Sequence, residues 1–307
     1  MNLVTRSDFD GLVCGVLLKE IGVIDDFVFK HPKDLQDGLY QATANDCLAN
    51  VPFVPGCGLW FDHHSSEEER KAYEGKYVGC SKHSPSCASV VFEYYGGTSK
   101  FGHKFDELVS ACDKVDSANL TMDEIMNPKG YILLGFLCDP RTGLGRFRNF
   151  RISNYQLMEK LLNDCRFKTS AEILSDPDVV ERINLYNEQT ESYKKMVLAN
   201  SKVVDNVIIT DLRGAETIYC CNRFMIYSLF PEANISCWIV SGFKGQGCSC
   251  AVGYSVLNRT SSVDVGSLML KYGGGGHKAV GTCQFSNETM PQKVPEMLAE
   301  LEALNCK

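Results

Sequence analysis

The sequence predicts an α/β protein, with an N-terminal domain built on a parallel sheet and a smaller mixed α/β domain at the C-terminus. First, short strand-like runs alternate with helical patterns over the first 120 residues, an order typical of parallel strands joined by crossover helices. Second, a similar alternation begins again near Val203, after a mainly helical middle. Third, the length of 307 residues exceeds the usual size of one domain.

In the N-terminal part, the first strand is expected to begin at Leu3 and Val4. Apolar residues then recur at helical spacing, and later runs are short and apolar as in buried strands. The expected helices cover 9–21, 86–95 and 105–115, and the expected strands cover 25–30 and 58–61. Two glycines after the helix 86–95 suit a helix stop.

From 121 to about 198 the patterns are mainly helical, with a loop at 139–153 and a long polar-faced segment from 178. The second alternation then predicts a mixed domain. Its expected strands are 206–210, 235–240, 248–257 and 280–285, and its expected helices are 222–229, 263–272 and a last one from about 291.

Composition excludes several classes of protein. The N-terminus has two aspartates in its first ten residues, and no stretch of about 18 apolar residues follows, so we expect no membrane association and a cytoplasmic location. The fifteen cysteines are odd in number and form no Cys-x-x-Cys pair, which disfavours disulfides and zinc or iron–sulfur sites. A net charge of −7 disfavours long polyanions and favours a small phosphorylated substrate.

Two aspartates follow the first expected strand. Asp8 and Asp10 lie where this strand gives way to a helix, just before Gly11. In an open parallel sheet, ligands bind at the carboxyl edge, so both carboxylates are candidates for binding a metal ion. The same residues also suit a turn or the N-cap of a helix.

Asp62, His63 and His64 follow the buried run 58–61 in the same strand-end position. Carboxylate oxygen together with imidazole nitrogen suits manganese or a similar divalent cation better than calcium. A solvent-exposed polar loop is the alternative interpretation of these three residues alone.

Two further aspartates extend this candidate site. Asp46 precedes Asp62 by about one strand's length of chain, and Asp116 ends the expected helix 105–115. Together with a histidine, these carboxylates would suffice for two metal ions about 3.5–4 Å apart, the spacing that clamps both the attacking and the leaving oxygen of a phosphoryl group.

Four consecutive glycines, 273–276, precede His277. Such a run exposes backbone N–H groups and lets a substrate approach closely, and His277 adds a donor for a phosphate oxygen. A flexible surface loop is the alternative, although the helix and strand on either side disfavour a linker.

In this order, the motifs resemble those of the DHH phosphoesterases that carry a DHH-associated C-terminal domain. The superfamily includes the exonuclease RecJ, nanoRNases and exopolyphosphatase-like proteins, and the resemblance covers nearly the whole chain. It implies a hydrolase with two divalent cations, manganese first and magnesium or cobalt as alternatives, and a homodimer. It also implies a catalytic domain with a helical extension at 1–177, a linker helix at 178–201, and a substrate-binding domain at 202–307 across a cleft.

The resemblance further implies roles for the matching residues. The implied metal ligands are Asp8, Asp10, Asp46, Asp62, His63 and Asp116, with Asp46 bridging the two ions. The implied catalytic set is Asp62, His63 and His64, with His64 facing the substrate. The implied substrate-binding residues are Arg6, Arg259, Gly274, Gly275, Gly276 and His277. A metal-activated water would attack phosphorus in line while the cations and an arginine neutralise the developing charge.

Arg6 departs from the family pattern, because relatives with a similar first motif often have a metal-binding histidine two residues before the first aspartate. An arginine cannot lose its proton to coordinate a cation. We therefore expect the first metal to be held more weakly or completed by water, and Arg6 to contact a substrate phosphate instead.

The segment 139–151 carries four arginines and two phenylalanines in an otherwise acidic chain. One interpretation is a flap that contacts phosphates and bases. The alternative is a solvated loop anchored by its aromatic residues. The segment also resembles part of the exopolyphosphatase-like branch.

Three functions fit these observations. The leading one is hydrolysis of a phosphodiester or phosphomonoester in a small nucleotide, such as a short oligonucleotide or a nucleotide bisphosphate. The second is an exopolyphosphatase acting on inorganic polyphosphate. The third is a nucleotide-binding regulator with weakened catalysis, suggested by Arg6. Clustered carboxylates disfavour the third function and a purely structural role, because like charges repel unless a metal offsets them.

Overall fold

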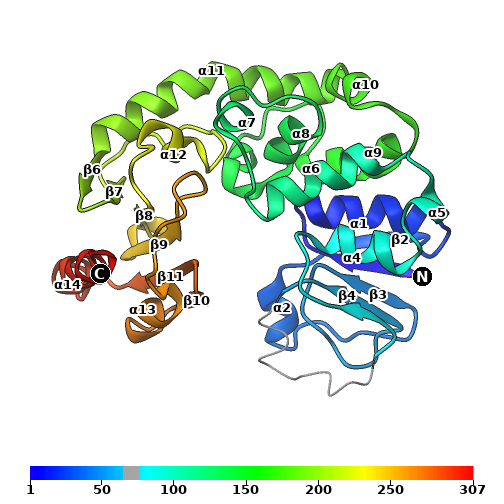
Figure 1. Cartoon of the computed structure of the whole chain (residues 1–307), viewed down its shortest axis with the longest axis horizontal. Helices are drawn as coiled ribbons and strands as arrows, with labels where there is room; N and C mark the ends of the chain where they lie inside the picture. The colour runs from blue at the N-terminus through cyan, green and yellow to red at the C-terminus, as the bar shows by residue number, and fades with distance from the viewer. Residues whose placement is uncertain (65–76, 307) are drawn as a thin grey trace. The chain divides into compact units, whose positions relative to one another are not determined.

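The computed structural model describes residues 1–64 and 77–306. The chain forms two compact units, which we call the N-terminal and C-terminal units (Figure 1). The N-terminal unit comprises Met1–Leu120 and Asn127–Tyr186, and the C-terminal unit comprises Thr121–Met126 and Asn187–Lys307. None of the helices in the described part of the chain is long and apolar enough to cross a membrane.

The sheet of the N-terminal unit is entirely parallel, as the sequence predicts. Its strands are β1 (Asn2–Thr5), β2 (Asp26–Phe29), β3 (Asp46–Ala49), β4 (Leu59–Asp62) and β5 (Gly79–Ser81), in the spatial order β2-β1-β3-β4-β5. The strand order therefore reverses between β1 and β3. In such sheets a ligand binds beyond the carboxyl ends of the two strands at this switch point.

Helices cover this sheet, and α1 is the most buried of them. The helices of this unit are α1 (Phe9–Glu20), α2 (Pro32–Gln36), α4 (Cys87–Tyr94), α5 (Thr98–Phe101), α6 (Asp106–Asp116), α8 (Gly130–Cys138), α9 (Asn154–Phe167) and α10 (Ser170–Leu174). Every residue of α1 from Phe9 to Leu18 is buried, because the helix packs against β1 and against α4, α6, α8 and α9 (Figure 1). The beginning of α1 is thereby fixed at the end of β1.

A helix of 24 residues, α11 (Pro177–Asn200), carries the chain from one unit into the other. The boundary between the compact units falls at Tyr186, inside this helix. The segment 139–153 before α9 contains only two short 3₁₀ turns, η1 (Pro140–Thr142) and η2 (Leu144–Arg146). The expected loop and the expected long helix are thus both present.

The C-terminal unit has a mixed sheet, which also agrees with the predicted fold class. Its strands are β6 (Ser201–Val204), β7 (Val207–Asp211), β8 (Ile235–Ser241), β9 (Cys248–Tyr254), β10 (Gly275–His277) and β11 (Val280–Phe285), in the order β10-β11-β9-β8-β7-β6. Only β7 and β8 pair in parallel among these described strands. The helices are α7 (Met122–Met126), α12 (Met225–Leu229), α13 (Val265–Lys271) and α14 (Met290–Asn305), with a 3₁₀ turn η3 (Phe243–Gly245).

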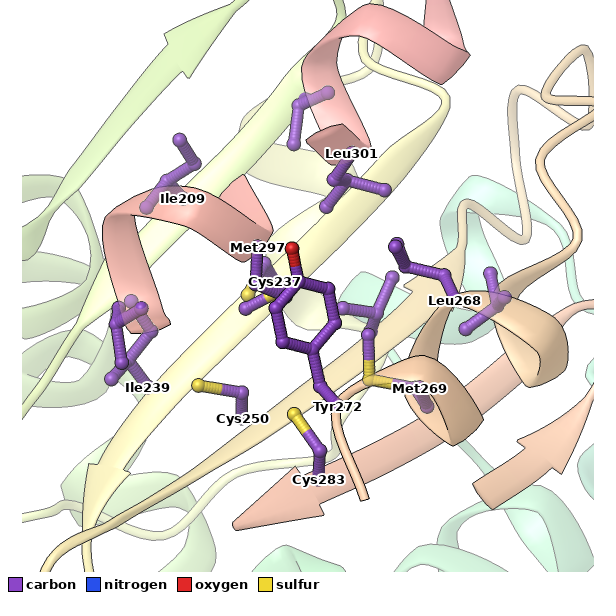
Figure 2. Packing of buried hydrophobic residues seen from close by; sticks show 14 of the residues in the cluster. Ile209, Cys237, Ile239, Cys250, Leu268, Met269, Tyr272, Cys283, Met297 and Leu301 are labelled. Carbon is purple, nitrogen blue, oxygen red and sulfur yellow. The ribbon is translucent and has the colours of Figure 1, made fainter. Parts of the chain in front are cut away.

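One face of this sheet packs against α13 and α14, and cysteines form part of that core (Figure 2). Cys250 of β9 lies directly opposite Cys283 of β11, and both thiols are buried. Met269 of α13 and Met297 of α14 pack into the same cluster. All fifteen cysteines are thiols, and those shown in Figure 2 act as small apolar side chains.

Candidate metal centre

Asp8 and Asp10 lie at the switch point, directly after β1. Asp8 is the N-cap of α1, and its Oδ1 accepts the backbone N–H of Gly11 at 3.0 Å. The Nε of Arg6 lies 3.0 Å from Asp8 Oδ2, and Asn50 Nδ2 donates to Asp8 Oδ1 at 3.0 Å. The N-cap role of Asp8 is therefore present, and its role as a metal ligand stays a prediction.

Gly11 is required by the tight path of the chain between β1 and α1. A Cβ at this position would lie 2.1 Å from the carbonyl oxygen of Arg6 and 2.6 Å from Thr5 Oγ1. A side chain can fit only if the backbone that carries Asp8 and Asp10 shifts. The glycine thus permits the tight turn that carries Asp8 and Asp10.

We expect Gly11→Ala to lower the free energy of unfolding by about 3 kcal/mol, because it overpacks a rigid backbone contact. Gly145→Ala is the matched control, since a Cβ there would meet no atom within 4 Å, and we expect it to change stability by less than about 0.5 kcal/mol. Urea unfolding of both variants measures the difference. Equal stability of the two variants would contradict this explanation of Gly11.

Asp10 is a fully enclosed carboxylate. Its oxygens accept the backbone N–H groups of Cys87 at 2.9 Å and Ala88 at 2.8 Å, at the beginning of α4. Burial, followed by the charge of Asp116, raises the pKa of Asp10 to about 7, although His63 and the Cys87 N–H oppose this shift. A raised pKa of this kind is typical of a carboxylate cluster whose like charges need a cation.

His63 joins Asp10 and Asp116 in one cluster. Its Nδ1 lies 3.1 Å from the carbonyl oxygen of Ser84. Its Nε2 lies 3.6 Å from Asp10 Oδ2 and 3.3 Å from Asp116 Oδ2. The three residues offer ligand atoms that all lie within 4.8 Å of one another.

The chemistry of this cluster fits a divalent cation. A carbonyl oxygen only accepts, so Nδ1 of His63 carries the proton, and in the neutral ring Nε2 then presents a lone pair. That Nε2 is buried without a hydrogen-bond partner in the described part of the chain. Two carboxylates and an imidazole lone pair facing one point form the oxygen and nitrogen ligand set that suits manganese-like ions.

Asp62 and His64 lie beside this cluster at the end of β4. Asp62 Oδ1 lies 2.8 Å from His64 Nδ1, while Asp62 Oδ2 is buried and has no hydrogen-bond partner among the described residues. Burial by itself would lower the pKa of His64, but the hydrogen bond and charge of Asp62 and the charge of Asp116 outweigh it and raise the pKa to about 9. Without a cation, His64 is therefore an imidazolium at neutral pH.

Asp46 does not lie in this cluster, so its predicted place as a bridging ligand is wrong. It begins β3 and pairs in register with Asn2, at the amino end of β1. Its oxygens accept from Thr43 N at 2.7 Å and from Asn2 Nδ2 at 3.3 Å. At about 3.3 Å per residue, the length of β3 puts Asp46 about 10 Å from the carboxyl edge.

Asn50, which no predicted motif includes, directly follows the carboxyl end of β3. It is buried, adopts a left-handed backbone conformation with φ of 57°, and holds Asp8 through its amide. Asparagine tolerates this conformation better than most residues. A polar residue able to turn the chain right after a buried strand was the available signal.

Asp139 and Arg141 were also missed as individual site residues. They line a cavity of about 10 Å³ together with Asp8, Asp10 and Asp116, a volume that suits about one water-sized sphere. Asp139 follows α8, and its Oδ1 accepts both the backbone N and the Nε of Arg141 at 2.8 Å. The arginine-rich segment 139–151 indicated a phosphate-contacting role, but the sequence did not show which of its arginines lies at the metal centre.

Three of the predicted binding residues of the C-terminal unit, Gly275, Gly276 and His277, lie in a strand rather than in an open glycine loop. Gly275–His277 is β10, paired antiparallel with β11. A Cβ at Gly274 would lie 2.0 Å from the carbonyl oxygen of Thr282, and one at Gly276 would lie 2.3 Å from that of Val280. These two glycines therefore serve close backbone packing.

His277 and Arg259 are both exposed. The Nε of Arg259 donates to the carbonyl oxygen of Val256 at 3.2 Å. Both side chains remain candidates for contact with a ligand, and their binding role stays a prediction.

Solved structures of known proteins resemble this chain, whereas no protein-family model and no curated protein matches it. A pGpG-specific phosphodiesterase, PggH from Vibrio cholerae, is 45% identical over 99% of both chains, with a TM-score of 0.86. An exopolyphosphatase-related protein from Bacteroides fragilis is 15% identical over 100% of this chain and 93% of its own, with a TM-score of 0.54. RecJ from Thermus thermophilus in complex with Mn²⁺ is 12% identical over 98% of this chain and 51% of its own, with a TM-score of 0.53. The last two likenesses show the fold alone.

The fold and the site together define a metal-dependent phosphoesterase, an enzyme that hydrolyses phosphoester bonds. With a relative that is 45% identical over nearly its full length, the chain belongs to the DHH superfamily. The resemblance drawn from the motifs is confirmed.

Proposed function

We propose that this enzyme hydrolyses the phosphodiester bond of a short linear dinucleotide of the pGpG type and releases mononucleotides. The observation that carries the proposal is the 45% identity, over 99% of both chains, to a pGpG-specific phosphodiesterase. The formal net charge of −7 agrees with a substrate of few phosphates. The exopolyphosphatase alternative has only a fold-level likeness in its favour.

Asp10, His63 and Asp116 are proposed to hold a divalent cation, with Asp8 and Asp62 completing the site for a second one. The ligand atoms of Asp10, His63 and Asp116 converge. The buried Nε2 of His63 and Oδ2 of Asp62 have no hydrogen-bond partners within residues 1–64 and 77–306. Manganese is the proposed metal, because the ligand set mixes oxygen with nitrogen. When bound, such ions lower the pKa of water and offset the charge of the phosphoryl group.

The other site residues are proposed to orient the metal-binding carboxylates and to offset the negative charge of the substrate phosphate. Arg6 holds Asp8 by its Nε, so it orients that carboxylate and leaves the rest of its guanidinium to face a substrate phosphate. Asn50 fixes the second oxygen of Asp8. His64, restrained by Asp62, is proposed to face the substrate and donate a hydrogen bond to it.

The proposed division of labour follows the predicted boundaries, with catalysis in 1–177, a linker helix at 178–201 and substrate binding in 202–307. In the last domain, Arg259 and His277 are the proposed phosphate-binding side chains, and both are exposed. Gly273 and Gly275 have the most open backbone of the run, since a Cβ at either position would meet no atom within 4 Å.

A substrate panel tests this proposal. Purified protein with manganese is given pGpG, pApA, 3′-phosphoadenosine 5′-phosphate and short-chain polyphosphate, and kcat/KM is measured for each. We expect pGpG to be turned over at least about tenfold better than the others, since buried polar groups that read a base discriminate by 1.4 kcal/mol or more. Equal turnover of polyphosphate, or none of pGpG, would reject the dinucleotide as substrate.

A further inference from the structure

The four arginines of the segment 139–151 differ in where they lie. Arg151 Nε lies 3.6 Å from Asp178 Oδ1, at the beginning of α11. The guanidinium of Arg146 folds over Gly143, whose Cβ position it approaches to 2.2 Å. Arg148 is exposed. Arg141 alone of the four lines the cavity of the metal centre.

Arg141 is held in place before any ligand arrives. Asp139 is 5% exposed and accepts both the backbone N and the side-chain Nε of Arg141 at 2.8 Å. The next residue, Thr142, is 2% exposed and donates its hydroxyl to the carbonyl oxygen of Phe136 at 2.6 Å. The turn is therefore anchored on α8, and the guanidinium has little freedom to leave the cavity.

The outer edge of the Arg141 guanidinium is available. Within the described part of the chain, Arg141 donates hydrogen bonds from its backbone N and its Nε only, so its two terminal amino groups have no hydrogen-bond partner there. The side chain is 45% exposed. A planar fork of N–H donors, charged and open at one edge, matches two oxygens of a phosphoryl group.

Negatively charged side chains surround the Arg141 guanidinium and stabilise its positive charge. Burial would lower the pKa of Arg141, but Asp139 outweighs it, and Asp8 and Asp116 add to the rise. These two carboxylates line the same cavity as Arg141, so the guanidinium lies beside the proposed metal centre. A positive group at that place offsets charge that develops during phosphoryl transfer.

We propose that Arg141 is a catalytic residue that binds a non-bridging oxygen of the scissile phosphate, and that Asp139 positions its guanidinium for this contact. The inference rests on the proposed phosphodiesterase function. The other three arginines of the segment do not line this cavity.

Arg141→Gln tests the proposal, with Arg148→Gln as the matched control from the same segment. We expect kcat/KM for pGpG to fall about 10²- to 10³-fold in Arg141→Gln, the usual effect of removing one transition-state donor, and by less than about threefold in Arg148→Gln. Arg141→Lys keeps the charge but loses the fork, so we expect an intermediate loss. A loss in Arg141→Gln below about threefold, or an equal loss in both glutamine variants, would overturn the proposal.

Two further readouts separate this inference from its alternatives. The first is calorimetry with Mn²⁺ alone. We expect Arg141→Gln to bind Mn²⁺ as tightly as wild type or more tightly, because a nearby positive charge is removed. Weaker Mn²⁺ binding would instead make Arg141 a structural support of the metal centre. Inorganic phosphate should bind the manganese-loaded variant at least about tenfold more weakly than wild type, and equal binding would overturn the proposal without any need for turnover.

Bis(p-nitrophenyl) phosphate serves as a generic diester. If wild type cleaves it but not pGpG, the proposed substrate is wrong, while the comparison of the arginine variants still decides the role of Arg141.

Discussion

Asp116→Asn is expected to lower kcat for pGpG about 10³-fold or more, because the loss of one charged ligand costs several kcal/mol of transition-state stabilisation. The variant should nevertheless be as stable as wild type without metal, or more so. Asp116 raises the pKa of Asp10 through like-charge repulsion, and the amide removes that repulsion. Steady-state kinetics, manganese calorimetry and urea unfolding measure the three quantities.

Asp46→Asn is the matched control and should behave in the opposite way. Asp46 accepts hydrogen bonds from Thr43 N, Thr43 Oγ1 and Asn2 Nδ2 at the other edge of the sheet. We expect Asp46→Asn to lower the free energy of unfolding by about 1 kcal/mol. Turnover and manganese affinity should stay within about twofold of wild type. If Asp46→Asn loses metal affinity and Asp116→Asn does not, the placement of the metal centre is wrong.

The metal-free enzyme is expected to lose stability as the pH rises from about 4 to about 7. The pKa of Asp10 rises from 3.8 to about 7 in the folded protein, chiefly through burial. In this window the folded state binds more protons than the unfolded state, so the free energy of unfolding falls with pH.

His64 extends this loss to higher pH. Its pKa rises from 6.5 to about 9 in the folded protein, so its stabilising contribution is complete below about pH 6.5 and disappears as the pH approaches 9. Asp10 and His64 therefore both lower the free energy of unfolding as the pH rises, Asp10 between about pH 4 and 7 and His64 between about pH 6.5 and 9.

Manganese should reverse this trend, because it binds the ionised carboxylates. At about 1,000 times its Kd, a ligand that binds only the folded state adds about 4 kcal/mol. Urea unfolding at pH 5 and pH 8, with chelator and with manganese, measures the effect. Asp10→Asn is the control, and it should remove most of the loss of stability between about pH 4 and 7. A metal-free protein that is more stable at pH 8 than at pH 5 would contradict this account.

The sequence predicts the ends of the buried strands well where one polar motif follows each strand. Asp8 and Asp10 follow β1, and Asp62 with His63 follows β4, so their meeting at one edge needed only the rule for parallel sheets. The strand β3 has polar residues at both ends, because Asp46 is its first residue and Asn50 follows its last one. No strand was expected over 46–49, so the sequence did not show that Asp46 lies at the amino end of a strand and Asn50 just beyond its carboxyl end.

Long-range packing decided what else the sequence could not predict. Asp139 and Arg141 reach the metal centre because α8 packs against α1 and α6, and no local pattern encodes that contact. In the C-terminal unit, the sequence of four glycines at 273–276 is compatible both with a loop that exposes its N–H groups and with close packing against a neighbouring strand. Only the pairing of β10 with β11 distinguishes the two uses.

The most direct test of the metal centre is a crystal of the manganese-loaded protein, measured near the manganese absorption edge. We predict an anomalous peak within bonding distance of Asp10, His63 and Asp116, and no peak at Asp46. A peak at Asp46, or no peak beside His63 at saturating manganese, would contradict the central claim that these three side chains form the metal site of a phosphodiesterase.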